Sequence, residues 1–184
     1  MKERMLRGEL YHASDPELAA ELAHCQGLLE RYNASSHADP DERERLLKEL
    51  LGEVGAGVTV RPPFHCDYGW NISIGAGTFV NYSCVLLDVL PIRIGSNCQV
   101  ASGVQLLTAT HPLEPGPRRD GWEYGEPIAI GDNVWLGGGV IVCPGVTIGD
   151  DTVVGAGAIV TRDLPAGVVA VGNPARTTRS LADG

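Results

Sequence analysis

Aliphatic residues recur at every sixth position over most of the chain, and this period constrains the fold more than any other feature. An α-helix repeats about every 3.6 residues and a β-strand every two, so neither element alone produces a period of six. A chain that turns a corner every six residues does produce it, and three such sides close one triangular coil. The period therefore predicts a solenoid whose stacked coils pair as short parallel strands. The periodic residues are Ile74, Val80, Leu86, Ile94, Val100, Leu106, Ile130, Leu136, Val142, Ile148, Val154 and Val160.

Two interruptions mark places where the chain leaves the regular coil. The step from Leu86 to Ile94 is eight residues, so two extra residues are expected to bulge near residues 89–91. The step from Leu106 to Ile130 is 24 residues and contains THPLEPGPRRDGWEYGEP, which is rich in Pro, Gly and charge. A long structureless excursion from a compact repeat is usually functional, and a flexible decoration is the alternative.

The residues beside the inward aliphatics are expected on the outer faces of the prism, because side chains alternate along an extended strand. Residues eighteen apart should then stack on the same face. Two of the three faces are apolar and need to be covered, which predicts a homo-oligomer in which three prisms share faces. The alternative is that helices of the same subunit cover one face. The stacked pairs are Trp135 with Val153, Ile141 with Ile159, and Ala129 with Thr147.

Helical patterns precede the solenoid. Asp-Pro dipeptides at 15–16 and 39–40 each place a capping side chain before a proline, which is typical of a helix start. Glu42 stands where it completes a capping box, and Gly52 stands where a helix needs a C-cap. The two apolar stripes are Leu18, Leu22, Cys25 and Leu29, and Leu46, Leu47, Leu50 and Leu51.

These patterns divide the chain into two parts. We expect a helical module at residues 1–57 and a mainly β solenoid at residues 58–184, with an excursion loop at 107–127. The N-terminus lacks the apolar run of a signal peptide, and no stretch approaches transmembrane length, so we expect the protein in the cytoplasm.

The composition argues against several kinds of partner. The formal net charge is −9, and so acidic a chain is a poor partner for nucleic acid or for an anionic membrane. The five cysteines form no Cys-x-x-Cys pair, so neither a metal finger nor a disulfide framework is expected.

With the repeat and the loop in view, the chain resembles the hexapeptide-repeat acetyltransferases, and more narrowly the maltose, galactoside and nodulation-factor O-acetyltransferases. The resemblance runs almost end to end and implies a left-handed parallel β-helix that forms homotrimers with sites between subunits. It also implies direct transfer of an acetyl group from acetyl-CoA to a hydroxyl, which we expect on a sugar. The matching segments, in order, are MLRGELYHASDPEL, PPFHCDYGWNISIG, NYSCVLLDV, TATHPL, IGDNVWLGGGVIVCPGVTIGD and VVAVGNPAR.

The resemblance implies two catalytic residues. His111, on the excursion loop, matches the family's general base, and a neutral imidazole can remove the proton that makes an alcohol a poor nucleophile. Its alternative is an exposed loop histidine. Asn81 matches an asparagine near the acceptor and the thioester, where its amide can donate a hydrogen bond to developing negative charge. Its alternative is a coil-corner residue that tolerates unusual backbone angles.

Four further residues are expected to bind the acceptor. Asp88, at the bulge, resembles an acidic position that orients sugar or histidine, but Val89 replaces the second acid that some relatives carry. Asp67 stands where galactoside-type relatives tend to have Ser, and a carboxylate can accept two hydrogen bonds from sugar hydroxyls; a surface turn is the alternative. Tyr11 and Asp15 lie in the helical module and are expected to reach the acceptor, although helix capping alone would explain Asp15.

The resemblance also implies a groove for acetyl-CoA. A peptide N–H near Gly138 is a candidate to stabilise the thioester oxyanion, although relatives often have Ser there. Arg162, Arg176 and Arg179 are expected to hold the CoA phosphates, with solvated surface charge as the alternative for each. The residues matching the groove are Trp135, Gly138, Ala156 and Thr161.

Three other functions stay open. A zinc carbonic anhydrase on the same prism needs three histidines, and the repeat region offers only His65 and His111, so we expect no metal. A non-catalytic scaffold and an antibiotic acetyltransferase share the fold, and fold alone does not prove function. His65 and Cys66 are neighbours, yet adjacent residues of an extended strand point to opposite faces and form a poor nucleophilic or metal-binding pair.

Overall fold

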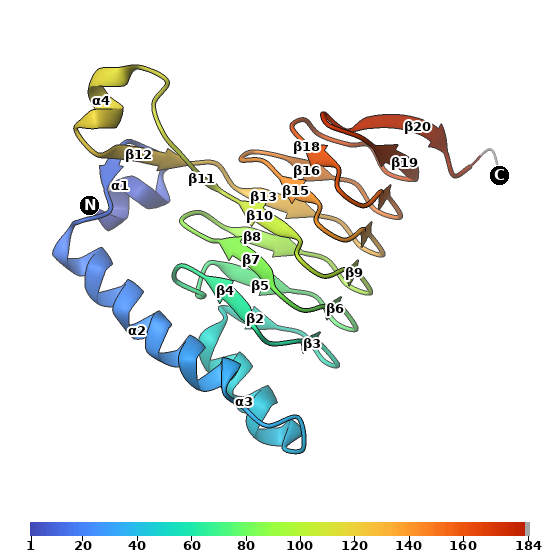
Figure 1. Ribbon diagram of the computed structural model, residues 1–184, viewed down its shortest axis with the longest axis horizontal. Coiled ribbons are helices and arrows are strands. Elements are labelled where there is room, and N and C mark those ends of the chain that lie inside the picture. Colours follow the sequence, from blue (N-terminus) through green and yellow to red (C-terminus); the bar gives the residue numbers. More distant parts are fainter. Residues whose placement is uncertain (183–184) are drawn as a thin grey trace.

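The computed structural model describes residues 1–182. Its body is a stack of coils, with α2 running along one side and α3 beside the first coil, while the excursion with α4 projects from the middle of the stack beside α1 (Figure 1). The prediction of a mainly β parallel solenoid is therefore confirmed. The elements before the solenoid are α1 (Lys2–Leu6), β1 (Tyr11–His12), α2 (Pro16–Asn33) and α3 (Pro40–Leu50).

Three sheets form the faces of the prism, because each coil contributes one short strand to each face. Their orders are β18-β15-β10-β7-β4, β16-β13-β8-β5-β2 and β20-β19-β17-β14-β9-β6-β3, all parallel except for β20 against β19. The solenoid strands are β2 (Glu53–Val54), β3 (Thr59–Val60), β4 (Phe64–Cys66), β5 (Ile72–Ile74), β6 (Phe79–Val80), β7 (Cys84–Leu87), β8 (Ile92–Ile94), β9 (Gln99–Val100), β10 (Gln105–Leu107), β13 (Ile128–Ile130), β14 (Trp135–Leu136), β15 (Ile141–Val142), β16 (Thr147–Ile148), β17 (Val153–Val154), β18 (Ile159–Val160), β19 (Val168–Val171) and β20 (Arg176–Ser180).

The strand register confirms the stacking expected from the spacing of eighteen. All twelve periodic aliphatics are at most 4% exposed, so they form the core of the prism. Burying one such side chain contributes roughly 1.5–3 kcal/mol, which makes this column the main source of stability. The corners need small residues: a Cβ on Gly75 would lie 2.6 Å from the carbonyl carbon of Gly95 in the next coil. The stacked pairs are Trp135 and Val153, Ile141 and Ile159, and Ala129 and Thr147.

The solenoid begins before residue 58. The strand β2 already pairs in parallel with β5, so the first coil runs through Val54, Val60 and Cys66. This coil keeps the six-residue step and leaves it by the same eight-residue step as the second coil. Because Cys66 stands in place of an aliphatic residue, the first coil is less evident in the sequence.

The helix starts have the predicted caps. Asp15 Oδ1 accepts a hydrogen bond from Glu17 N at 3.2 Å, and Asp39 Oδ1 accepts one from Glu42 N at 3.1 Å. The carboxylate of Glu42 binds the Arg45 guanidinium instead of returning to Asp39, so only half of the predicted capping box forms.

Two expectations for the helices were wrong. Gly52 is not the C-cap, because α3 ends at Leu50 and its C-cap is Leu51, whose backbone is extended. Gly52 is instead needed for close backbone approach, since a Cβ there would lie 2.2 Å from Trp70 O. The predicted apolar stripe of α2 included Leu22, but Leu22 is 38% exposed. The buried face of the helix consists instead of Leu18, Cys25, Leu28, Leu29 and Tyr32.

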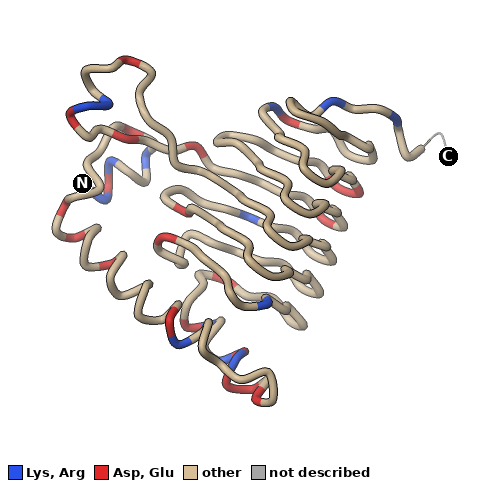
Figure 2. The backbone as a smooth tube through the Cα atoms, viewed as in Figure 1, with Lys and Arg blue, Asp and Glu red and all other residues tan. Residues whose placement is uncertain are grey.

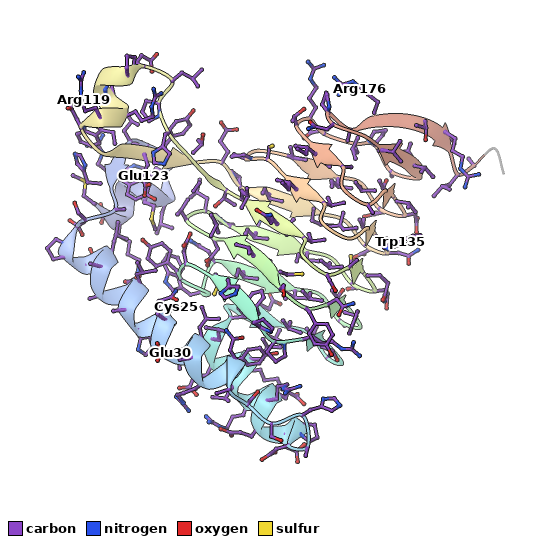
Figure 3. All side chains as sticks on the ribbon, in the orientation of Figure 1. Cys25, Glu30, Arg119, Glu123, Trp135 and Arg176 are labelled. Carbon is purple, nitrogen blue, oxygen red and sulfur yellow. The ribbon has the colours of Figure 1, made fainter. Side chains whose placement is uncertain are left out.

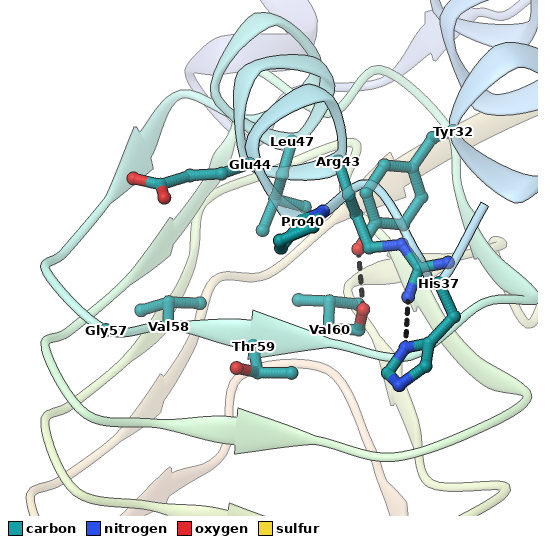
Figure 4. Close-up of a pocket in the computed structure, with 10 residues that line it drawn as sticks. All are labelled: Tyr32, His37, Pro40, Arg43, Glu44, Leu47, Gly57, Val58, Thr59 and Val60. Carbon is teal, nitrogen blue, oxygen red and sulfur yellow. Dashed lines mark hydrogen bonds between the residues drawn. The ribbon is translucent and has the colours of Figure 1, made fainter. Parts of the chain in front are cut away.

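A cavity of about 340 Å³ lies between α3 and β3, and Figure 4 shows the side chains around it. Tyr32 Oη donates a hydrogen bond to Val60 O at 2.6 Å, and Arg43 Nη1 lies 3.3 Å from His37 Nδ1. The first contact ties α2 to the first coil, and the second braces the turn between α2 and α3. None of the residues around this cavity is a predicted site residue.

The excursion at 107–127 is not structureless, which corrects the sequence interpretation. It contains β11 (Ala109–Thr110), α4 (Pro115–Arg119) and β12 (Trp122–Gly125), and β12 pairs antiparallel with both β11 and β1. The partner strand β1 comes from the N-terminal module, so no pattern within the excursion could reveal it.

Candidate active site

His111 follows β11, and its side chain is exposed. Its Nδ1 lies 3.4 Å from the carbonyl oxygen of Trp122 on β12, a long hydrogen bond in which a protonated Nδ1 donates. That tautomer leaves Nε2 with a free lone pair, which is the state a general base requires.

The N-terminal module braces the strand that orients His111. The ring of Trp122 packs against His12 with centroids 3.8 Å apart, and the Arg4 guanidinium lies 5.5 Å from the Trp122 ring. His12 Nδ1 also lies 3.1 Å from Gly121 O. Residues of α1 and β1 therefore fix the carbonyl group that holds the histidine.

Three carboxylates gather beside β1. Glu123 stands opposite Tyr11 in the register of β1 and β12. Burial, together with the negative charges of Asp88 and Glu123, raises the pKa of Asp67 to about 7. Sequence reasoning missed Glu123, whose only signal was its place on the same excursion as His111.

Asp88 lies at the predicted bulge and is fully buried. Its Oδ1 accepts hydrogen bonds from the backbone N–H groups of Asp67 and Tyr68, both at 2.9 Å, and its Oδ2 accepts one from Asn71 N at 3.3 Å. Burial raises the pKa of Asp88 to about 6, while these N–H groups act in the opposite direction. With both oxygens engaged, Asp88 shapes the loop that carries Asp67.

Tyr11 is fully buried, and its Oη has no hydrogen-bond partner within residues 1–182. Burial raises the pKa of Tyr11, and the nearby Glu123 charge adds to the effect. Asp15 has two structural contacts, since it caps α2 and its Oδ2 lies 3.6 Å from the N-terminal ammonium. The geometry therefore gives Tyr11 unused hydrogen-bonding capacity and gives Asp15 a capping role.

The raised pKa of Asp67 predicts a pH-dependent stability. The pKa rises from about 3.9 in the unfolded chain to about 7 in the folded one, so the folded state binds this proton more tightly. The stabilisation is present below pH 4 and is lost as the pH rises through about 7. We expect Asp67→Asn to reduce the fall in Tm between pH 5 and pH 8, measured by calorimetry. The exposed Asp120→Asn is the control, and an equal slope in both variants would contradict the prediction.

Asn81 and Trp135 lie together on another face of the prism. Both line a hollow of about 200 Å³ over β6, β9 and β14. Asn81 Oδ1 accepts a hydrogen bond from Tyr82 N at 2.9 Å, and in the described part of the chain its Nδ2 has no acceptor. Trp135 is 55% exposed, so an amide donor and an aromatic surface are both free to bind a ligand.

Gly138 lies at the coil corner after β14. The N–H groups on either side, of Gly137 and Gly139, donate to Val154 O and Ser102 O at 2.8 and 2.9 Å. The Gly138 N–H itself has no acceptor among residues 1–182, so it is free to bind an anion. Ala156, eighteen residues later, occupies the corresponding corner of the next coil and is exposed.

The C-terminal arginines carry unpaired charge. Every ion pair in the described chain lies within residues 1–49, so Arg162, Arg176 and Arg179 have no acidic partner there. All three are exposed, as is Thr161 after β18. Figure 2 shows basic positions at this end of the solenoid, away from the mixed charges of the helices.

The predicted site residues form two groups within one chain. His111, Tyr11, Asp67 and Asp88 lie around the excursion, whereas Asn81, Trp135 and the arginines lie along the other side of the solenoid. In Figure 3, Glu123 on the excursion and Trp135 on β14 are labelled on opposite sides of the molecule. No hydrogen bond of the described residues joins His111 to Asn81.

The structure gives little support to a His-Cys pair, a metal site or a membrane-spanning helix. His65 is exposed and Cys66 is buried, as expected for neighbours on β4, so they do not form a pair. Residues 1–182 hold no cluster of three metal-ligating side chains. In the same range, no helix combines the length and the apolar character needed to span a membrane.

Family models match three stretches of the chain. The maltose acetyltransferase hexapeptide capping motif matches residues 4–55, the hexapeptide repeat of succinyl-transferase matches residues 71–107, and the bacterial transferase hexapeptide (six repeats) matches residues 127–162. The first stretch covers the N-terminal helices, and the other two cover solenoid coils before and after the excursion.

Relatives extend this match to nearly the whole chain. Nodulation protein L of Rhizobium meliloti (strain 1021) is 51% identical over 175 residues, which are 95% of this chain and 96% of that protein. The structure of a maltose O-acetyltransferase from Clostridium difficile 630 has a TM-score of 0.96 at 47% identity, covering 98% of this chain and 96% of that one. A galactoside acetyltransferase in complex with coenzyme A has a TM-score of 0.96 at 39% identity, covering 100% and 92%. The chain therefore belongs to the hexapeptide-repeat acetyltransferases, in the branch of the maltose, galactoside and nodulation O-acetyltransferases, and is an acyltransferase.

Proposed function

We propose that this enzyme transfers the acetyl group of acetyl-CoA directly to a hydroxyl of a sugar, with His111 as the general base. The observation that carries the proposal is the Nδ1 contact between His111 and Trp122 O, which leaves Nε2 free to accept a proton. The relatives named for maltose and galactoside support a sugar acceptor.

In the proposed reaction, Nε2 of His111 removes the proton of the acceptor hydroxyl as its oxygen attacks the thioester carbonyl carbon. The carbonyl oxygen becomes negative, and we assign the free N–H of Gly138 and the free amide of Asn81 as its hydrogen-bond donors. The C–S bond then breaks, and the departing CoA thiolate takes the proton from His111. The products are an acetyl ester and CoA.

We assign the acceptor side to the carboxylate cluster. Asp67 accepts hydrogen bonds from acceptor hydroxyls, and Glu123 adds a second carboxylate that the resemblance did not indicate. Asp88 positions Asp67 through the loop that it holds. Tyr11 offers its unpartnered hydroxyl, while Asp15 contributes chiefly as a helix cap.

The donor side has two parts. The pantetheine arm of acetyl-CoA lies along Trp135, Gly138, Ala156 and Thr161, which are partly or fully exposed along successive coils. The phosphates bind Arg162, Arg176 and Arg179, because unpaired guanidinium groups are strong phosphate ligands in an otherwise acidic protein.

We infer a homotrimer in which a neighbouring subunit completes each site. The helices α2 and α3 pack against the first coil, so they leave the exposed Trp135 and Tyr82 uncovered. A neighbour packed there would bring its own His111 toward Asn81 and Trp135, which one chain keeps apart.

The test of this function is release of the CoA thiol from acetyl-CoA across a panel of sugars. Sugar-dependent release with a matching acetyl ester in the product is the expected result. CoA release that requires an aminoglycoside or another antibiotic would mean that the acceptor is an antibiotic and not a sugar. A folded protein that neither releases nor binds CoA would make the chain a non-catalytic scaffold.

A second prediction concerns the donor side. A Cβ at Gly138 would lie 3.6 Å from Ser102 O, an ordinary contact, so Gly138→Ser fits without strain. The added hydroxyl can donate beside the free N–H, and we expect kcat/KM for acetyl-CoA to rise about two- to tenfold. The matched control is Gly116→Ser on α4, where a Cβ meets nothing within 4 Å. A fall in kcat/KM, or the same change in both variants, would argue against this placement of the thioester.

A further inference from the structure

A second cavity of about 320 Å³ lies between the N-terminal helices and the segment that joins β4 to β5. It is distinct from the residues assigned to acetyl transfer. It is nevertheless adjacent to them, because Tyr68 in its wall directly follows Asp67. The residues around it are Lys2, Ala20, Glu21, His24, Tyr68 and Trp70.

Two of the residues that line this cavity each have a buried polar atom without a hydrogen-bond partner within residues 1–182. Trp70 Nε1 can only donate, and the carboxylate oxygen Oε2 of Glu21 can only accept. The other carboxylate oxygen of Glu21 already binds Lys2 Nζ. Buried polar groups without partners are costly and uncommon, so this pair calls for a ligand that supplies both an acceptor and a donor.

The surroundings of the two atoms favour an uncharged ligand with an apolar face. Lys2 neutralises Glu21, and its Nζ lies 4.5 Å from the centroid of the Trp70 ring. The rings of Tyr68 and Trp70 are 5.7 Å apart and tilted by 45°, and together they form an aromatic wall. A sugar ring combines hydroxyls that donate and accept with C–H faces that pack on aromatic rings. One water occupies only about 30 Å³, so a single water does not fill this space.

We propose that this cavity is a second sugar-binding subsite, which holds one unit of an oligosaccharide acceptor while the neighbouring unit is acetylated. The proposal rests on the sugar acceptor proposed above. The two subsites share one anchor, because Asp88 Oδ1 accepts hydrogen bonds from both Asp67 N and Tyr68 N. A chain of sugar units that passes Tyr68 therefore meets Asp67 on one side and Trp70 with Glu21 on the other.

The experiment compares acetylation of monosaccharides with that of longer sugars. The probes are glucose, maltose and maltotriose, galactose and lactose, and glucosamine with its β-1,4-linked dimer. We expect the native enzyme to have a higher kcat/KM for the longer member of at least one series. Trp70→Phe keeps the ring but removes the N–H, and we expect it to lower kcat/KM for that longer sugar about tenfold while leaving the monosaccharide unchanged. Glu21→Gln, which removes the carboxylate acceptor, should act in the same way if Trp70→Phe fails to fold.

The control is Glu30→Gln, at an exposed position on the same helix (Figure 3), which should leave both sugars unaffected. Equal losses for short and long sugars, or no preference for length in any series, would overturn the subsite. If no sugar is acetylated, the proposed function itself fails, and ligand-detected NMR then tests the cavity with the same sugars. Binding that Trp70→Phe weakens would still support the subsite, and absence of binding to the native protein would overturn it.

Discussion

His111→Ala is expected to lower kcat/KM for acetyl transfer by about 10²–10⁴-fold, because the acceptor hydroxyl then loses its general base. His111 is exposed, and its contact with Trp122 O is long, so its loss should leave the fold unchanged. The measurement is CoA thiol release under saturating acetyl-CoA, together with Tm and the affinity for CoA. We expect the last two to equal those of the native enzyme.

The matched control is His37→Ala, since His37 is also exposed but lies beside the cavity at α3. It should retain native activity. If His111→Ala kept more than about a tenth of native kcat/KM, the base would have to be another group. Glu123 would then be the first to examine, because it shares the excursion and faces the same cluster.

Mixing two inactive variants is expected to restore activity if each site lies between subunits. Asn81→Ala alone should lose about 10²–10³-fold, the usual effect of removing one donor to an oxyanion. In a mixed trimer of His111→Ala and Asn81→Ala chains, about one third of the sites, one of the three, combine an intact His111 with an intact Asn81, whichever chain is present twice. Co-expression with two affinity tags, followed by isolation of mixed trimers, gives the measurement.

Recovery of about a third of native activity in the mixed trimers would support the shared site. Mixed trimers as inactive as either parent would mean that His111 and Asn81 act within one chain. That outcome would require the excursion to move toward β6, because the structure keeps these two residues in separate groups. Trimers built only from His111→Ala chains serve as the inactive reference.

The prism was predictable because its repeat is a pattern of residues that are near in the chain. A period of six, with an aliphatic residue at each inward position, specifies where the chain turns and which side chains are buried. The spacing of eighteen likewise predicted the outer pairs, such as Trp135 with Val153, without knowledge of the rest of the chain. The first coil was missed because Cys66 weakens its pattern and because β2 follows α3 closely.

The environment of the site residues was not predictable in the same way. The excursion gave no sign of its strands, because β12 acquires its partner β1 only when the N-terminal module folds back onto it. The resemblance indicated Asp88 as an acceptor contact, but its burial and three backbone N–H donors show an anchor for the Asp67 loop. Glu123 became a candidate only through its place opposite Tyr11.

The sequence by itself determined the solenoid and the caps of its two longer helices, because both depend on residues that are near in the chain or that recur at a fixed spacing. His111 became the candidate base through the resemblance to a family. Only the tertiary structure decided the raised pKa of Asp67, the unpartnered Tyr11 hydroxyl and the free Gly138 N–H. Desolvation, charge proximity and hydrogen-bond satisfaction depend on which distant segments meet in space, and spacing along the chain does not encode that meeting.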